Sequence, residues 1–154
     1  MSGDHKPALY IPALGGLYDN LRPLAWPLVR IVTGLFMLPH GAQKLFGWFG
    51  GNPEAMAGFF AKIGLEPAMP LVIVTGLVEV FGGLLLVLGL FTRPAAVATA
   101  ILMLVAVVKV HLANGFFWSS NGFEYPLMWA VLAIAIACKG GGNLSLDRKV
   151  GREF

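Results

Sequence analysis

Four long apolar segments follow one another along the chain, separated by short stretches rich in glycine, proline and polar residues. A helix needs roughly 20 apolar residues, with a range of about 17–25, to cross a hydrocarbon core about 30 Å thick. The segments cover residues 24–46, 68–91, 95–117 and 124–139, and the last is the shortest. This pattern predicts an all-α integral membrane protein built as a four-helix bundle.

The break after the first segment carries signals of its own. Asn52 and Pro53 have the character of an N-cap and first-turn pair, and Gly64 that of a helix stop, so a short helix is predicted between them. Its positions Met56 and Phe59 are apolar. We expect this helix to lie in the membrane interface instead of crossing the bilayer.

Composition supports the membrane assignment. Of the 154 residues, 57% are hydrophobic and 12% charged, and the mean hydropathy is +0.76. The only cysteine, Cys138, excludes an internal disulfide and a paired-thiol redox site. The net charge of +3 comes without a long basic tract, which argues against nucleic-acid binding. Residues 1–23 lack the pattern of a cleaved signal peptide and are expected to form an interfacial segment.

Charge is distributed unevenly between the two ends of the predicted bundle. With four crossings, both termini share one side with the 92–94 turn, and the opposite side has Lys62 and, at a helix end, Lys44. The basic residues on the side of the termini are Lys6, Arg22, Arg93, Lys139, Arg148, Lys149 and Arg152. Because basic residues concentrate on cytoplasmic loops, both termini are predicted to be cytoplasmic.

Six ionisable side chains fall within the apolar segments. A charged group at a helix centre costs about 2.5–3.5 kcal/mol unless it pairs or reaches water, so these groups are expected to interact. They are Arg30, His40, Lys44, Glu79, Lys109 and His111. Counting the rise of each helix places Glu79 close in depth to Lys109 and a longer reach from Arg30, so we expect a pair with one of them and leave the choice open.

The surroundings of Glu79 indicate that it faces protein. Gly76 and Gly83 share its helical stripe, and small residues let a neighbouring helix approach closely. His40 and His111 lie in the outer half, where Lys44, Glu124 and the aromatic loop 116–118 could complete a pocket for a ring-shaped ligand.

Each of these groups also has a purely structural reading. A buried ion pair can fix helix register, a histidine near a membrane end can bond a backbone carbonyl, and a lysine at a helix end can extend to the headgroups. The histidines stand on separate helices, so no metal site is predicted, and no catalytic residue is assigned.

Several separated motifs, in order, resemble the DoxX family of small bacterial integral membrane proteins. They are "RIVTGLFMLPHGAQKLFG", "EVFGGLLLVLGLFTRPAA", "HLANGFF" followed by "NGFEYPL", and "GGGNLSLD". The resemblance implies a four-helix bundle in the bacterial inner membrane. Three regions follow: an interfacial segment at 1–23, a DoxX-like domain at 24–147 and a basic cytoplasmic tail at 148–154.

The resemblance also implies an association with quinone-linked oxidoreductases. The first functional hypothesis is that the six ionisable residues help bind a quinone or similar small ring compound while a partner supplies electrons. The second is a non-catalytic accessory or assembly subunit that packs within a larger membrane complex. The third is a proton-coupled transporter, which the small size and the lack of an internal inverted repeat disfavour.

Overall fold

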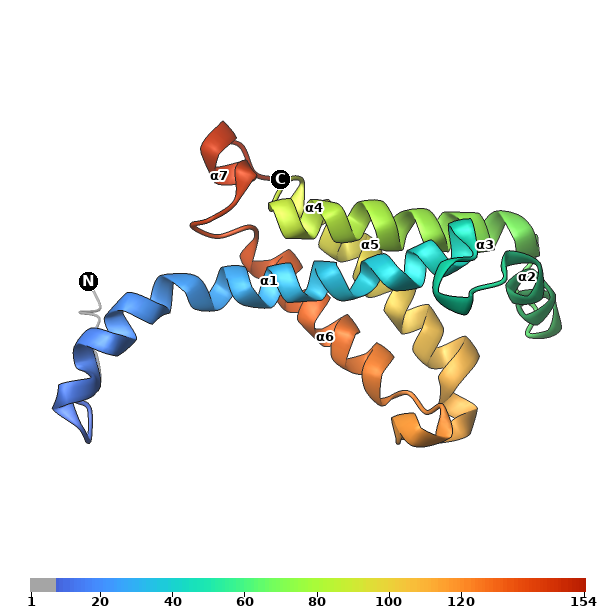
Figure 1. The fold of residues 1–154 in the computed structure, drawn as a ribbon, viewed down its shortest axis with the longest axis horizontal. Helices are drawn as coiled ribbons and strands as arrows, with labels where there is room; N and C mark the ends of the chain where they lie inside the picture. The colour runs from blue at the N-terminus through green and yellow to red at the C-terminus, as the bar shows by residue number, and fades with distance from the viewer. Residues whose placement is uncertain (1–7) are drawn as a thin grey trace.

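A computed structural model of the protein describes residues 8–154, and no residue in that range lies in a β-strand. The all-α class is therefore confirmed for the described part (Figure 1). With η denoting a 3-10 or π helix, the elements are η1 (Pro12–Leu14), α1 (Gly15–Phe46), η2 (Trp48–Gly50), α2 (Pro53–Lys62), α3 (Ala68–Leu77), η3 (Val78–Gly82), α4 (Gly83–Leu88), α5 (Thr92–Ala106), η4 (Val107–His111), η5 (Leu112–Asn114), η6 (Trp118–Ser120), α6 (Glu124–Lys139) and α7 (Leu146–Val150).

Three continuous helices are long and apolar enough to cross a membrane. They are Pro12–Phe46, Ala68–Leu88 and Thr92–Asn114, of which the second joins α3, η3 and α4 and the third joins α5, η4 and η5. The fourth predicted segment is helical over the predicted residues, but α6 has only 16 of them. By length and composition, therefore, three helices of the described part are candidate membrane spans.

The first helix begins much earlier than the apolar pattern indicates. Helix α1 starts at Gly15 and not at residue 24, and it contains Pro23, Pro27 and Pro39. Proline removes a backbone donor and tends to bend a helix, so it need not end one. The early part of α1 extends away from the other helices in Figure 1. Residues 1–7 of the predicted interfacial segment, with Lys6, lie outside the described residues.

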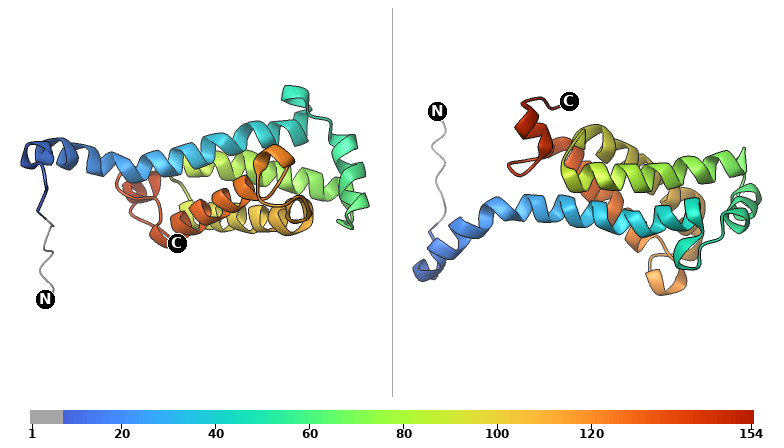
Figure 2. Two further views of the ribbon diagram at one scale, coloured as in Figure 1. Left: turned by 90° about the horizontal axis from the view of Figure 1, so that it is seen from below. Right: turned by 45° about the horizontal axis from the view of Figure 1, so that its top comes forward.

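The helices pack mainly as two pairs. Helix α1 lies along α3 and α4, while α5 packs chiefly against α6. Phe36 of α1 and Trp129 of α6 join the pairs through rings whose centroids are 5.4 Å apart. The short helix predicted after the first segment is present as α2, with Asn52 Oδ1 accepting from Ala55 N at 2.9 Å. Figure 2 shows α2 running across the end of the α1 and α3 helices.

Glycines set the close approach of α1 to the second long helix. A Cβ atom placed on Gly41 would lie 2.8 Å from the carbonyl oxygen of Gly76, and one on Gly83 would lie 2.8 Å from that of Gly34. Such distances are too short for real side chains, so only glycine permits this spacing. The predicted role of Gly76 and Gly83 as small contact residues is confirmed.

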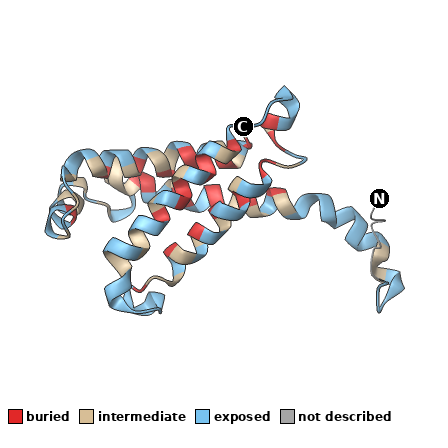
Figure 3. Ribbon diagram, turned by 180° about the vertical axis from the view of Figure 1, so that it is seen from behind, coloured by how far each residue is buried: buried red, intermediate tan, exposed pale blue. Residues whose placement is uncertain are grey.

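Buried residues concentrate where the helices cross, and most of the remaining helical surface is exposed (Figure 3). The core is small: one cluster holds Leu86, Ala96 and Ile136, and another holds Met37 and Met103. Soluble proteins rarely expose large contiguous apolar patches. Exposed leucine, valine, isoleucine and phenylalanine along the long helices therefore fit a protein whose outer surface contacts lipid.

Candidate functional site

A buried ion pair joins α1 to the second long helix. Lys44 Nζ donates to both carboxylate oxygens of Glu79, at 2.9 Å to Oε1 and 2.8 Å to Oε2. Glu79 is only 4% exposed. The pair lies on two candidate spans, where the low dielectric strengthens charge interactions and where an unpaired charge is costly.

Local backbone geometry presents Glu79 to this partner. The residue belongs to η3, a π-helical segment that interrupts an otherwise α-helical span between α3 and α4. Such segments occur frequently at functional sites, because the wider turn alters where side chains point. Gly76 and Gly83, three residues before and four after Glu79, hold α1 close enough for Lys44 to reach the carboxylate.

The prediction that Glu79 pairs with Arg30 or Lys109 is wrong, because its partner is Lys44. We expected Arg30 or Lys109, because the depth count gave Lys44 a position nearer the outer surface. Side chains in a helix point back toward its N-terminus. Lys44 Nζ does so and also donates to the carbonyl oxygen of His40, one turn earlier, at 3.3 Å. The ammonium group therefore lies deeper than the backbone of Lys44, at the level of Glu79.

His40 lies one helical turn before Lys44 on α1, and its backbone carbonyl oxygen accepts from Lys44 Nζ. It is exposed, whereas Lys44 is half-buried and Glu79 is buried. The three residues therefore run from the surface inward.

Arg30 has no bond to Lys44 or Glu79 and lies instead at the end of α4. Its guanidinium donates to the carbonyl oxygens of Leu86 and Val87 at the end of α4, at 3.0 Å for Val87, and to that of Leu144 at 2.6 Å. The side chain is 1% exposed. Arg30 thus satisfies carbonyl groups that the end of α4 leaves without intrahelical partners.

The two remaining predicted site residues lie on η4, a second π-helical segment. His111 Nδ1 donates to the carbonyl oxygen of Asn121 at 2.7 Å, and Asn114 Nδ2 donates to the same oxygen at 3.2 Å. His111 therefore closes the loop between α5 and α6. Lys109 is exposed, and no hydrogen bond or ion pair joins it to another residue in the described range.

The aromatic loop is organised mainly by its own contacts. Phe116 packs edge-on against Phe117 and Phe123, and a Glu124 carboxylate oxygen accepts from Trp118 N at 3.1 Å. Two surface hollows in the described part lie elsewhere, and neither is lined by Lys44, Glu79 or His111. The pocket expected in the outer half stays a prediction.

Sequence reasoning missed Asp147, which ties the C-terminal segment to the helices. Its carboxylate accepts from Phe91 N at 2.8 Å and Thr92 N at 2.9 Å, at the start of α5. Asp147 N donates to Gly89 O at 2.8 Å. The available signal was Ser145 as an N-cap with an acid two residues later, and it predicts a short helix without indicating what that helix contacts.

Comparison with known proteins gives the chain a family. The DoxX family model matches residues 25–112. An "Uncharacterized protein" of Haemophilus influenzae is 33% identical over 134 residues, covering 85% of this chain and 94% of that relative. The Bacillus subtilis protein named "Putative oxidoreductase CatD" is 33% identical over 120 residues, covering 78% of this chain and 82% of its own length.

A third relative bears on location. The "Inner membrane protein YphA" of Escherichia coli is 32% identical over 142 residues, covering 86% of this chain and 94% of that relative. No solved structure matches the chain. The family match and the three candidate spans agree with the motifs noted in the sequence. The chain is a membrane protein that belongs to the DoxX family.

Proposed function

We propose that this protein is a membrane component that binds a quinone or a similar small ring compound and works with an oxidoreductase system. The observation that carries the proposal is the Lys44–Glu79 pair, which offers an ammonium donor and a carboxylate acceptor together inside the candidate spans. A quinone carbonyl needs a donor, and the corresponding quinol hydroxyl needs an acceptor. The carboxylate of Glu79 has further lone pairs for the hydroxyl, and the N–H of Lys44 that donates to the His40 carbonyl at 3.3 Å, the longest of its three bonds, would turn to the quinone carbonyl.

The exposure of the residues near the pair and the name of one relative also support the proposal. The exposed His40 lies one helical turn before the half-buried Lys44, and we place the ring headgroup beside these two residues. The name of the Bacillus subtilis relative includes the word oxidoreductase. The electrons would come from a partner, since Lys44, Glu79 and His40 supply hydrogen bonds and charge.

The membrane placement belongs to the same proposal. We place α6 across the bilayer as a fourth crossing, α2 in the interface, and both termini in the cytoplasm of the bacterial inner membrane. In support, α2 runs across the end of the bundle, while α7 and the early part of α1 lie toward the opposite end (Figure 2). The basic residues of the C-terminal segment lie at that opposite end as well.

The test is a binding titration on the purified, detergent-solubilised protein. A short-chain quinone analogue is titrated, and the dissociation constant is measured for the unchanged chain, Glu79→Gln and His40→Ala. Loss of one charge-assisted hydrogen bond, worth about 1.5–3 kcal/mol, should raise the dissociation constant of Glu79→Gln more than tenfold. His40→Ala, at an exposed position, should weaken binding less.

Glu54→Gln is the matched control, because it neutralises an exposed carboxylate on α2, away from the pair. Its dissociation constant should stay unchanged. Equal affinities across the unchanged chain, Glu79→Gln and His40→Ala would overturn the proposal. The melting temperature of each variant shows whether a loss of binding reflects unfolding.

A second function, an accessory subunit of a larger membrane complex, is favoured by one observation. Lys109 is exposed on a candidate span and has no partner among the described residues. An acidic residue on a neighbouring membrane protein would satisfy it. Under this alternative, Lys109→Leu releases a co-purifying protein in mild detergent, while Glu79→Gln leaves the complex intact.

A further inference from the structure

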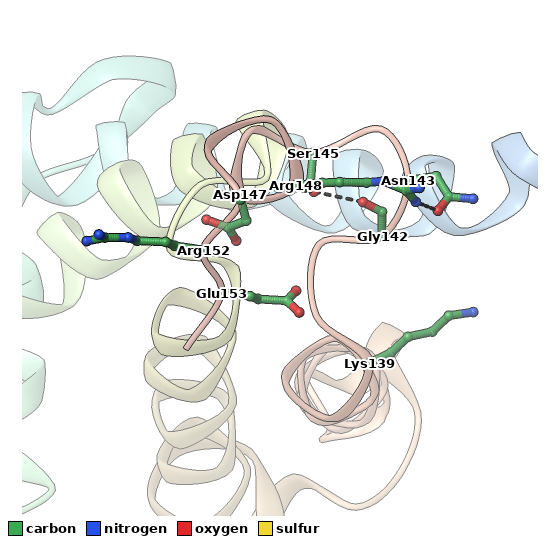
Figure 4. A pocket seen from close by; sticks show the side chains of 9 residues that line it. Lys139, Gly142, Asn143, Ser145, Asp147, Arg148, Arg152 and Glu153 are labelled. Atoms are coloured by element: carbon green, nitrogen blue, oxygen red, sulfur yellow. Dashed lines mark hydrogen bonds between the residues drawn. The ribbon is translucent and has the colours of Figure 1, made fainter.

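A surface hollow lies where the C-terminal segment folds back over the end of α6. It has a volume of about 340 Å³, and its lining includes Lys139, Asn143, Arg148 and Arg152 together with Asp147 and Glu153. In the view of Figure 4, Lys139 and Arg148 extend toward one side of the hollow and Arg152 toward the other. We call it the C-terminal hollow.

The carboxylates of the C-terminal hollow are already occupied. Asp147 accepts from the backbone of Phe91 and Thr92. Glu153 accepts from Gly141 N at 2.8 Å and pairs with Arg93 at 3.5 Å. Two negative charges are thus committed to holding the segment in place.

The cations of the hollow, in contrast, lack carboxylate partners within the described range. Lys139 Nζ lies 4.5 Å from the centroid of the Trp26 ring, and Arg148 donates to the side-chain oxygen of Asn143. Arg152 forms no ion pair with a described residue, although the carboxylates of Asp147 and Glu153 lie close by. The hollow therefore offers positive charge and the amide of Asn143 to an anion.

Its position indicates which anion. Lys139 is the last residue of α6, and α4 ends and α5 begins beside the C-terminal segment, so the hollow lies at the end of the candidate spans. Indole rings such as that of Trp26 are typical of the headgroup level of a bilayer. A ligand at this depth is most readily a lipid headgroup.

An apolar groove supplies the second half of such a site. It has a volume of about 330 Å³ between α5 and α6, and its lining runs from Leu104 and Ile134 to Ala137 and Cys138. Cys138, which lines the groove, directly precedes Lys139, which lines the C-terminal hollow, so the two linings come within one residue of each other along α6. A charged hollow and an apolar groove that are lined by successive residues of α6 match the two parts of a phospholipid, its phosphate headgroup and its acyl chain.

We propose that the C-terminal hollow binds the phosphate of an anionic phospholipid through Lys139, Arg148 and Asn143, with an acyl chain in the groove between α5 and α6. The site is independent of the Lys44–Glu79 pair and goes beyond the proposed quinone function. Clusters of basic residues beside a membrane span recognise anionic lipids, with about 1 kcal/mol contributed by each basic side chain. The headgroup strengthens the attachment of the C-terminal segment to the membrane surface.

The experiment is native mass spectrometry of the full chain in detergent, titrated separately with phosphatidylglycerol and phosphatidylcholine. The unchanged protein should bind phosphatidylglycerol several-fold more tightly. Arg148→Gln should lower that affinity about fivefold, which is the fold-change that corresponds to about 1 kcal/mol. Lys62→Gln, the matched control, removes an exposed charge from α2 at the opposite end and should leave the affinity unchanged.

Two further measurements distinguish a lipid headgroup from a free phosphate and test whether the apolar groove contributes to the affinity. An excess of glycerol 3-phosphate should displace little of the lipid, because it cannot fill the apolar groove. Val97→Trp, which narrows that groove, should weaken phosphatidylglycerol binding and leave the basic residues in place. Equal affinity for the two lipids, an unchanged affinity in Arg148→Gln, or full displacement by glycerol 3-phosphate would each overturn the proposal.

Discussion

Lys44 and Glu79 depend on each other, since each leaves an uncompensated charge when the other is removed. The side chains are 15% and 5% exposed, so water screens the remaining charge poorly. Removing one partner of a buried pair typically costs about 3–5 kcal/mol, whereas replacing both with apolar groups can be neutral. Lys44→Leu and Glu79→Leu should each lower the free energy of unfolding by about 3 kcal/mol.

The double variant Lys44→Leu, Glu79→Leu should recover much of that loss. Reversible unfolding of the detergent-solubilised protein by a denaturing detergent measures all three free energies. A double variant that loses the sum of the two single effects would contradict a direct coupling between the residues.

The sequence allowed the candidate residues to be chosen but not their partners. Glu79 was recognisable as a lone carboxylate on a glycine stripe, and its burial follows from that. Its pairing depended on the direction of the Lys44 side chain, which a count of backbone rise ignores. Arg30 was recognisable as a buried cation, yet its acceptors include Leu144 in a loop that no periodic pattern locates.

At the scale of elements, the contact between α1 and the second long helix depends on the absence of side chains. A Cβ on Gly41 would lie 2.6 Å from Val80 Cγ2 and 2.8 Å from Gly76 O. Gly41→Ala should therefore destabilise the protein by about 1–3 kcal/mol, as overpacked cores do. The melting temperature in detergent is the measurement.

Gly58→Ala is the matched control for that prediction. Gly58 lies in α2, and a methyl group added there would have nothing within 4 Å, so alanine should stabilise the helix by up to about 1 kcal/mol. A Gly41→Ala variant as stable as Gly58→Ala would show that the helices have room to separate.

Helix existence was predictable and helix type was not. Long apolar runs located all the major helices, and Asn52 with Pro53 located α2. The π-helical segments η3 and η4 carry no comparable signal, because Val, Phe and Gly at 78–82 are ordinary residues for a membrane α-helix. Both segments nonetheless coincide with ionisable residues of the apolar runs.

At the scale of the whole molecule, the C-terminal segment is bonded to the start of α5 and to α1. Asp147 accepts two backbone N–H groups at the start of α5 and is itself buried. Asp147→Ala should lower the free energy of unfolding by about 2–3 kcal/mol, since it removes charge-assisted hydrogen bonds from buried donors. Glu124→Ala removes one exposed bond to Trp118 N and should cost less than about 1 kcal/mol.

Reversible unfolding monitored by circular dichroism compares the two variants. Equal effects would mean that the C-terminal segment contributes no more to stability than the aromatic loop. Proteolysis provides an independent readout, because in Asp147→Ala the segment should be cleaved while the long helices stay intact.

The Arg30–Leu144 contact joins residues 114 positions apart, which gives it a consequence for biosynthesis. Arg30 enters the membrane early in translation, whereas Leu144 and Asp147 leave the ribosome only after the long helices have been made. The carbonyl groups of Leu86 and Val87 become available to Arg30 once α4 has been made, whereas the guanidinium N–H that donates to Leu144 needs a temporary partner, such as water or lipid phosphate, until that residue is made. Insertion of the helices and locking of the bundle are thus separate events in time, and the second waits for the segment that carries Leu144.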